Sequence, residues 1–130
     1  MKKALVNSLT KELRENIPEI DFAFLFGSAM KKPIDQCQDV DIGAYLNTTV
    51  SLELIGKILE KVETLTKCRC DLSILNTASE ILRFEALKGI LLFVRDNKLE
   101  DYSSFYSLTC REYEDKMFWM KRQLSYRGYV

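Results

Sequence analysis

The predicted fold depends on residues 21–46, DFAFLFGSAMKKPIDQCQDVDIGAYL. This stretch opens with an apolar run, residues 22–26, whose short length and three phenylalanines favour a strand buried on both faces. Gly27 and Ser28 end the run, and a polar loop follows. From Val40 to Leu46 apolar residues alternate with polar or small ones, which predicts a second strand with one face in the core.

Two aspartates share the polar face of this second strand. Asp39 and Asp41 are two residues apart, so their carboxylates leave the same face with backbones about 6.5–7 Å apart. Carboxylate oxygens with no histidine or thiolate nearby suit Mg²⁺, which binds through a few carboxylates and the phosphates of a substrate. An isolated Asp-x-Asp pair equally fits solvated or turn-capping aspartates. The Gly27-Ser28 turn favours a phosphate site, to which Lys31 adds charge, because glycine lets the backbone approach a ligand and turn amides can hold phosphate oxygens.

Spacing predicts the remaining helices and strands. Apolar residues three and four apart indicate helices, and alternating ones indicate strands. A strand at 69–75 carries a third aspartate, Asp71. A capping box at Thr77–Glu80 and a left-handed cap at Gly89 bound one helix. The other expected elements are helices at 2–15, 52–65 and 98–127 and a strand at 90–94.

The expected fold class is α+β, with a small mixed sheet, helices packed on one face and a long C-terminal helix. All elements are expected in one domain, residues 1–130, with a core at 1–95 and a helical extension at 98–127. Eight of the fourteen aromatic residues lie in the last thirty positions, too many for one core-facing stripe. Either this extension presents a second apolar surface to a partner, or it breaks and wraps its own domain.

Composition narrows the classes of function. Nineteen basic residues balance nineteen acidic ones, so direct nucleic-acid binding is not expected. The longest apolar run, Ile90 to Val94, is too short to span a membrane, and the charged N-terminus does not resemble a secretory signal. The chain contains four cysteines and no histidine, and the spacing of Cys68 and Cys70 does not fit common zinc pairs, which favours reduced thiols. A cytoplasmic location is therefore expected.

A family motif can be read across the two strands. Gly27-Ser28, ten residues, and then Asp39-Val40-Asp41 resemble the G-S-x10-D-x-D motif of the DNA polymerase β-like nucleotidyltransferase superfamily. Asp71 resembles the third carboxylate of that superfamily. The short length and the segments FLFGS, DVDIGAYL and CDLSILN resemble the minimal nucleotidyltransferases, antitoxins of gene pairs with HEPN-domain toxins. The resemblance covers about residues 1–95.

This resemblance implies a polymerase β-like nucleotidyltransferase fold and a Mg²⁺-dependent transfer of AMP from ATP to a hydroxyl. Asp39, Asp41 and Asp71 would be the catalytic residues and would hold Mg²⁺, with two ions expected. Gly27, Ser28 and Lys31 would bind the nucleotide; Ala29 stands where many relatives carry a basic residue.

The acceptor implied by the same resemblance is a tyrosine on a partner HEPN-type toxin, which makes the chain the antitoxin of a toxin–antitoxin pair and allows a homodimer or a hetero-oligomer. Two alternatives stay open. One is a transferase for a small hydroxylated molecule such as an aminoglycoside, and the other is a non-catalytic antitoxin that acts by binding.

Overall fold

A computed structural model describes residues 3–27 and 39–126 of the chain. Its centre is a four-stranded sheet with the strand order β3-β2-β1-β4. β1 is antiparallel to both of its neighbours, and β2 and β3 are parallel. The strands are β1 (Ile20–Phe26), β2 (Asp39–Leu46), β3 (Arg69–Ile74) and β4 (Ile90–Val94). The predicted mixed sheet is confirmed.

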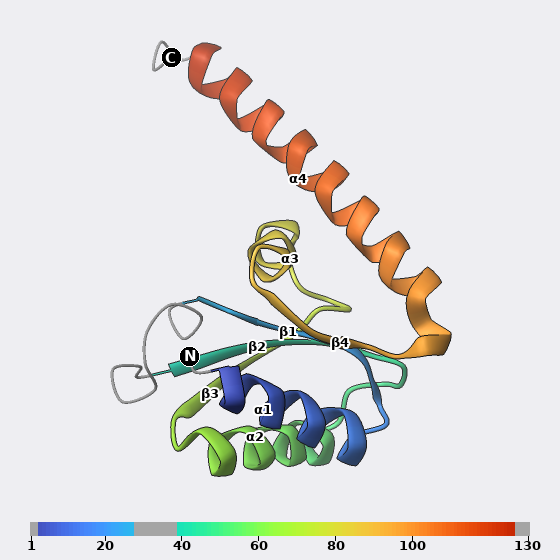
Figure 1. Cartoon of the computed structure of the whole chain (residues 1–130). Coiled ribbons are helices and arrows are strands. Elements are labelled where there is room, and N and C mark those ends of the chain that lie inside the picture. The colour runs from blue at the N-terminus through green and yellow to red at the C-terminus, as the bar shows by residue number, and fades with distance from the viewer. Residues whose placement is uncertain (1–2, 28–38, 127–130) are drawn as a thin grey trace.

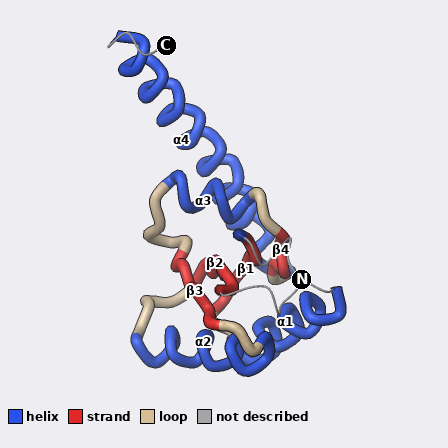
Figure 2. Tube along the Cα trace, turned by 90° about the vertical axis from the view of Figure 1, so that its left-hand side faces the viewer, coloured by secondary structure: helices blue, strands red, loops and turns tan. Residues whose placement is uncertain are grey.

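Helices cover both faces of the sheet. α1 and α2 lie side by side on one face, and α3 and the first part of α4 lie on the other (Figures 1 and 2). The prediction placed helices on one face; α3 and α4 cover the second face as well, because β1 is apolar at nearly every position and needs cover on both sides. The helices are α1 (Lys3–Asn16), α2 (Leu52–Thr66), α3 (Glu80–Leu87), the 3-10 turn η3 (Asp96–Lys98) and α4 (Leu99–Tyr126).

The face under α1 and α2 is aliphatic. Leu9 and Leu13, four residues apart on α1, are fully buried there, as are Ile58 and Val62 on α2. Each pair forms one stripe on its helix, and the two stripes close over the same side of the sheet. The strand residues packed in this layer include Ala23, Leu25, Val40, Ile42, Ala44 and Cys70, and the one aromatic residue among the described strand residues of this layer is Phe93 of β4.

The opposite face is aromatic. Phe22, Phe24 and Phe26 alternate along β1 with the residues of the aliphatic layer, so they point to the other side. The Phe22 ring stacks on Tyr45 of β2, with centroids 4.7 Å apart, and lies 5.2 Å from the Phe105 ring of α4. The aromatic layer therefore joins the sheet to α4.

Two predicted helix caps take a different form in the structure. Ser79 rather than Thr77 caps α3, accepting a hydrogen bond from the Leu82 amide, while Glu80 binds Lys116. Gly89 does not adopt the left-handed conformation expected of a helix cap. It is needed for space instead, since a Cβ atom there would collide with the carbonyl oxygen of Leu25 in β1.

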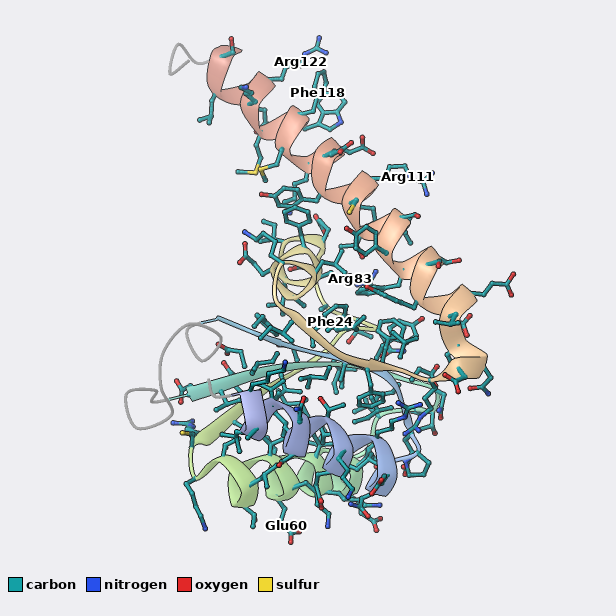
Figure 3. All side chains as sticks on the ribbon, in the orientation of Figure 1. Phe24, Glu60, Arg83, Arg111, Phe118 and Arg122 are labelled. Carbon is teal, nitrogen blue, oxygen red and sulfur yellow. The ribbon has the colours of Figure 1, made fainter. Side chains whose placement is uncertain are left out.

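α4 is one unbroken helix of 28 residues. It is held against α3 near its middle by the stacked rings of Phe84 and Tyr113, 3.8 Å apart, and by the Lys116–Glu80 ion pair, 2.8 Å long. Beyond this pair the helix extends away from the sheet, and Phe118 and Arg122 stand out from it (Figures 1 and 3). The large apolar side chains exposed on this projecting end are Phe118, Trp119, Met120 and Leu124.

The alternative of a broken, wrapped tail is therefore wrong within the described residues. None of the helices described here is both long and apolar enough to cross a membrane.

Candidate active site

Strand register brings two of the three aspartates side by side. In the parallel pair of β2 and β3, Asp41 lies opposite Asp71, and Asp39 lies opposite Arg69. Residues opposite each other in a ladder point to the same face, so Asp41 and Asp71 project together. Asp71 is exposed on the edge strand of the sheet, and Asp41 is half-buried.

The carboxylates lie on the same side of the sheet as α3 and α4. Val40 and Ile42, which flank Asp41 in β2, are buried in the aliphatic layer on the opposite side. On β1, Phe26 pairs with Asp41, and it belongs to the aromatic layer. The predicted alternation of β2 is confirmed by this packing, and it holds the aspartates out of the aliphatic core.

Gly27 lies directly beneath the Asp41 carboxylate. Its φ angle is +74°, a left-handed conformation that only glycine adopts without strain. A Cβ atom at this position would collide with Oδ2 of Asp41. Both the conformation and the space therefore require glycine, and the absent side chain lets the Asp41 carboxylate lie against the end of β1.

Negative charge accumulates at this point of the sheet. Burial raises the pKa of the Asp41 carboxyl above its usual value, and the charges of Asp71 and Asp39 and a hydrogen bond with Asp71 raise it further. A bound cation would relieve the same repulsion. The cluster therefore fits a hard divalent cation such as Mg²⁺, which prefers carboxylate oxygens. Within residues 3–27 and 39–126, no three carboxylate or thiolate side chains are gathered closely enough to hold an ion by themselves.

Cys70 precedes Asp71 in sequence but belongs to the opposite face. Burial, followed by the charges of Glu63, Asp71 and Asp41, raises the pKa of its thiol to about 12. Its amide donates a 2.9 Å hydrogen bond to the Glu63 carboxylate of α2. The thiol stays protonated and packs in the aliphatic layer, as expected for a core residue.

Other predicted site residues have different outcomes. Ser28 and Lys31 lie outside the described residues, as does Ala29, so their roles stay predictions. Tyr45 shares the aspartate face, and its ring is stacked on Phe22 within the domain. The sequence interpretation assigned no role to Arg69. The signal was present, because Arg69 and Asp71 are two apart on a strand, the same spacing that joins Asp39 to Asp41.

A mixed sheet with carboxylates on two neighbouring strands beside a glycine turn defines the nucleotidyltransferase class of fold. A family model described as polymerase beta nucleotidyltransferase matches residues 7–98. The chain belongs to this family. No curated protein matches it with significance.

Solved structures show the same architecture over nearly the whole chain. A chain in the complex of tri-AMPylated Shewanella oneidensis HEPN toxin with MNT antitoxin has a TM-score of 0.70 and 22% identity, covering 96% of this chain and 97% of that one. The toxin–antitoxin complex MntA-HepT gives 0.69 at 21% identity, with 95% and 97% covered. A toxin–antitoxin structure with AMP-PNP gives 0.70 at 22% identity, with 92% and 95% covered. At these identities the similarity establishes the fold.

Proposed function

We propose that the chain transfers AMP from ATP to a hydroxyl of a partner protein, with Mg²⁺, and acts as the antitoxin of a HEPN-type toxin. The observation that carries this proposal is the register of β2 and β3, which sets Asp41 beside Asp71 and against Gly27. Family membership supports nucleotidyl transfer. The similarity to chains of HEPN toxin complexes, one of which contains AMP-PNP, supports the partner and the nucleotide.

The carboxylates would hold Mg²⁺, which neutralises charge on the attacking and leaving oxygens of an in-line displacement. Asp41 and Asp71 would supply some of the Mg²⁺ ligands, and Asp39 and the phosphates of a bound nucleotide would supply the rest. Asp71 is exposed at the sheet edge, where an acceptor can reach it. There it would accept the proton of the acceptor hydroxyl while the new oxygen–phosphorus bond forms at the α-phosphate and pyrophosphate leaves.

The projecting end of α4 supports a protein acceptor rather than a small molecule. Phe118 and Trp119 are 60% and 59% exposed, and neighbouring exposed apolar side chains of this kind mark sites where proteins bind one another. Their rings are in edge-to-face contact, and the Arg122 guanidinium lies over Trp119, 5.7 Å from its centroid. Aromatic and arginine side chains grouped in this way are enriched where proteins bind one another. We therefore propose that the partner docks on this end of α4.

Transfer of labelled AMP tests the chemistry. The chain, a co-expressed HEPN-type toxin, Mg²⁺ and ATP labelled at the α-phosphate are expected to give labelled toxin, with the label on a tyrosine. Asp41→Asn is expected to lower the rate by about 100-fold or more, because charge stabilisation at the phosphates is lost. Asp96→Asn is the matched control, since Asp96 is the first residue of η3, is 99% exposed and is remote from the site. Equal transfer by Asp41→Asn and the wild type contradicts the proposal.

A second variant separates docking from chemistry. Trp119→Asp is expected to abolish labelling of the toxin and to leave binding of a non-hydrolysable ATP analogue unchanged. Full neutralisation of the toxin by a protein lacking Asp39, Asp41 and Asp71 would instead favour inhibition by binding alone. Because the reaction consumes ATP and the chain has cysteines expected to be reduced, the cytoplasm is its proposed location.

A further inference from the structure

Arg69 occupies a position on the edge of the sheet that the transfer chemistry above does not use. It begins β3, lies opposite Asp39 in the parallel ladder, and precedes Asp71 by two residues. Neighbouring strands are about 4.8 Å apart, and alternate residues of one strand share a face. The backbone therefore places Arg69 on the aspartate face, next to Asp39 and at the open side of the sheet.

The guanidinium of Arg69 is exposed and is not used to build the fold. Arg83 and Arg95 show the structural use of arginine in this chain. Arg83 donates to the carbonyls of Leu75 and Asn76, and the Nε of Arg95 donates to the carbonyl of Ile20 at 2.7 Å. Among the described residues, Arg69 makes no such hydrogen bond and no ion pair, although carboxylates flank it on two sides.

An available guanidinium beside carboxylates suits a ligand that brings phosphate oxygens to the cluster. Arginine presents a planar fork of donors that matches phosphate, and the resulting hydrogen bonds are charge-assisted. The negative charges of the three aspartates repel phosphate. The positive charge of Arg69 would reduce this repulsion on the β3 side. Gly27 lies at the end of β1, and β2 separates it from Arg69 on β3. Gly27 and Arg69 would therefore contact different parts of the reactants.

We propose that Arg69 binds a phosphate group of the reactants at the β3 edge of the aspartate cluster. This inference rests on the proposed nucleotidyl transfer. The phosphate has two possible sources: the triphosphate of ATP, or the phosphodiester of an acceptor that already carries one AMP. In the second case the acceptor is a ribose hydroxyl of the attached AMP. Its oxygen forms the new bond to the α-phosphate, pyrophosphate leaves, and the proton passes to Asp71.

The alternative role for Arg69 is a charge pair with Asp39 across the two strands. An arginine opposite Asp39 would then contribute only to the stability of the sheet. Removing it would lower the melting temperature and leave binding of reactants unchanged. Stability and phosphate binding therefore separate the two roles.

The experiment compares Arg69→Gln and Arg69→Lys with the wild type in the full-length chain. The matched control is Arg111→Gln, because Arg111 is an exposed arginine of α4 that points away from the sheet (Figure 3). The first measurement is the affinity for a non-hydrolysable ATP analogue with Mg²⁺, by calorimetry and without the toxin. The second is the number of AMP units on the toxin, by intact mass, at matched extents of labelling.

If Arg69 binds the triphosphate of ATP, we expect Arg69→Gln to lower the affinity for the analogue about 10-fold or more. If it binds the phosphodiester of the modified acceptor, we expect addition to stop after the first AMP. Arg69→Lys should fall between the glutamine variant and the wild type, since it keeps the charge and loses the planar fork. Arg111→Gln should match the wild type in both measurements. Unchanged affinity and an unchanged number of AMP units in Arg69→Gln would overturn the inference. A wild-type protein that transfers no AMP would instead refute the proposed function, and the calorimetry would still decide whether Arg69 binds phosphate.

Discussion

The two faces of the sheet are packed by different means. The face under α1 and α2 is filled by aliphatic side chains from two helices of 14 and 15 residues, which cover it along their length. Among residues 3–27 and 39–126, the other face is covered by α3, eight residues long, and by the first half of α4. Most of its aromatic rings gather around Phe22 at one end of β1, and the aspartates lie at the other end, beside Phe26. The face that carries the aspartates is therefore covered by less helix and is packed with larger side chains.

The largest expected effect is on the aromatic layer. Phe22→Ala should lower the free energy of unfolding by about 3–5 kcal/mol, because a fully buried ring with several aromatic neighbours is lost. Urea unfolding measures this cost. Because Phe22 contacts Tyr102 and Phe105, hydrogen exchange should also become faster in the first half of α4.

Leu13→Ala is the control from the aliphatic face. This substitution should lower the free energy of unfolding by roughly 2–5 kcal/mol. Hydrogen exchange in α4 should then occur only through global unfolding. Equal protection of α4 in the two variants would show that the faces are not packed independently.

Gly89→Ala should come next. The new methyl group would collide with the Leu25 carbonyl and crowd Phe26, so we expect a loss of about 1–3 kcal/mol in urea unfolding. Gly56→Ala is the matched control, because nothing lies within 4 Å of a Cβ atom on that exposed helical glycine. It should stabilise the protein by about 0.5–1 kcal/mol. The same sign of change for both glycines would contradict this account.

Asp41→Asn should change stability in the opposite direction from its effect on transfer. The raised pKa of Asp41 means that its ionised form costs stability at neutral pH, and that this cost disappears as the pH falls through the pKa of the folded state. We expect a gain of less than about 1 kcal/mol at pH 7 in urea unfolding, and a smaller gain once the pH has fallen through the pKa of the folded state. Asp21→Asn should instead destabilise, because that buried carboxylate accepts a hydrogen bond from Asn47 and lies 3.9 Å from Lys98.

The smallest effect concerns the contact that docks α4. The hydrogen bond and charge of Lys116 lower the pKa of Glu80, so the stability that Glu80 contributes is present above its unfolded pKa and is lost as the pH falls through the folded one. Glu80→Gln should lower the melting temperature slightly at pH 7, and this difference should vanish in acid. Glu60→Gln, on the exposed face of α2, should show no difference at either pH (Figure 3).

The sequence predicted local structure well where one pattern dominates. The alternation from Val40 to Leu46 identified both the strand and its buried face, because that face is decided within β2 itself. The apolar stripes of α1 and α2 were likewise readable from the sequence. Gly89 was misread, because its neighbour in space, Leu25, comes from a distant part of the chain.

The arrangement of the site depended on information that no local pattern contains. Alternation predicted Asp71 on a strand, but only the parallel pairing of β2 with β3 sets it opposite Asp41. The same pairing brings Arg69 to Asp39. The coverage of both sheet faces was also missed. An amphipathic stripe shows that a helix packs against something, but it does not show which face of the sheet the helix covers.

The crossover through α2 has a consequence for finding relatives from sequence. Because β2 and β3 are parallel, the chain between Asp41 and Asp71 must run the length of the sheet and return, and its loops can absorb insertions or deletions without disturbing the carboxylates. A single residue inserted within β3 ahead of Asp71 would turn that side chain to the opposite face. A search pattern should therefore fix the spacing of Asp39 and Asp41, leave the interval to Asp71 open, and require that the third aspartate alternate with apolar residues.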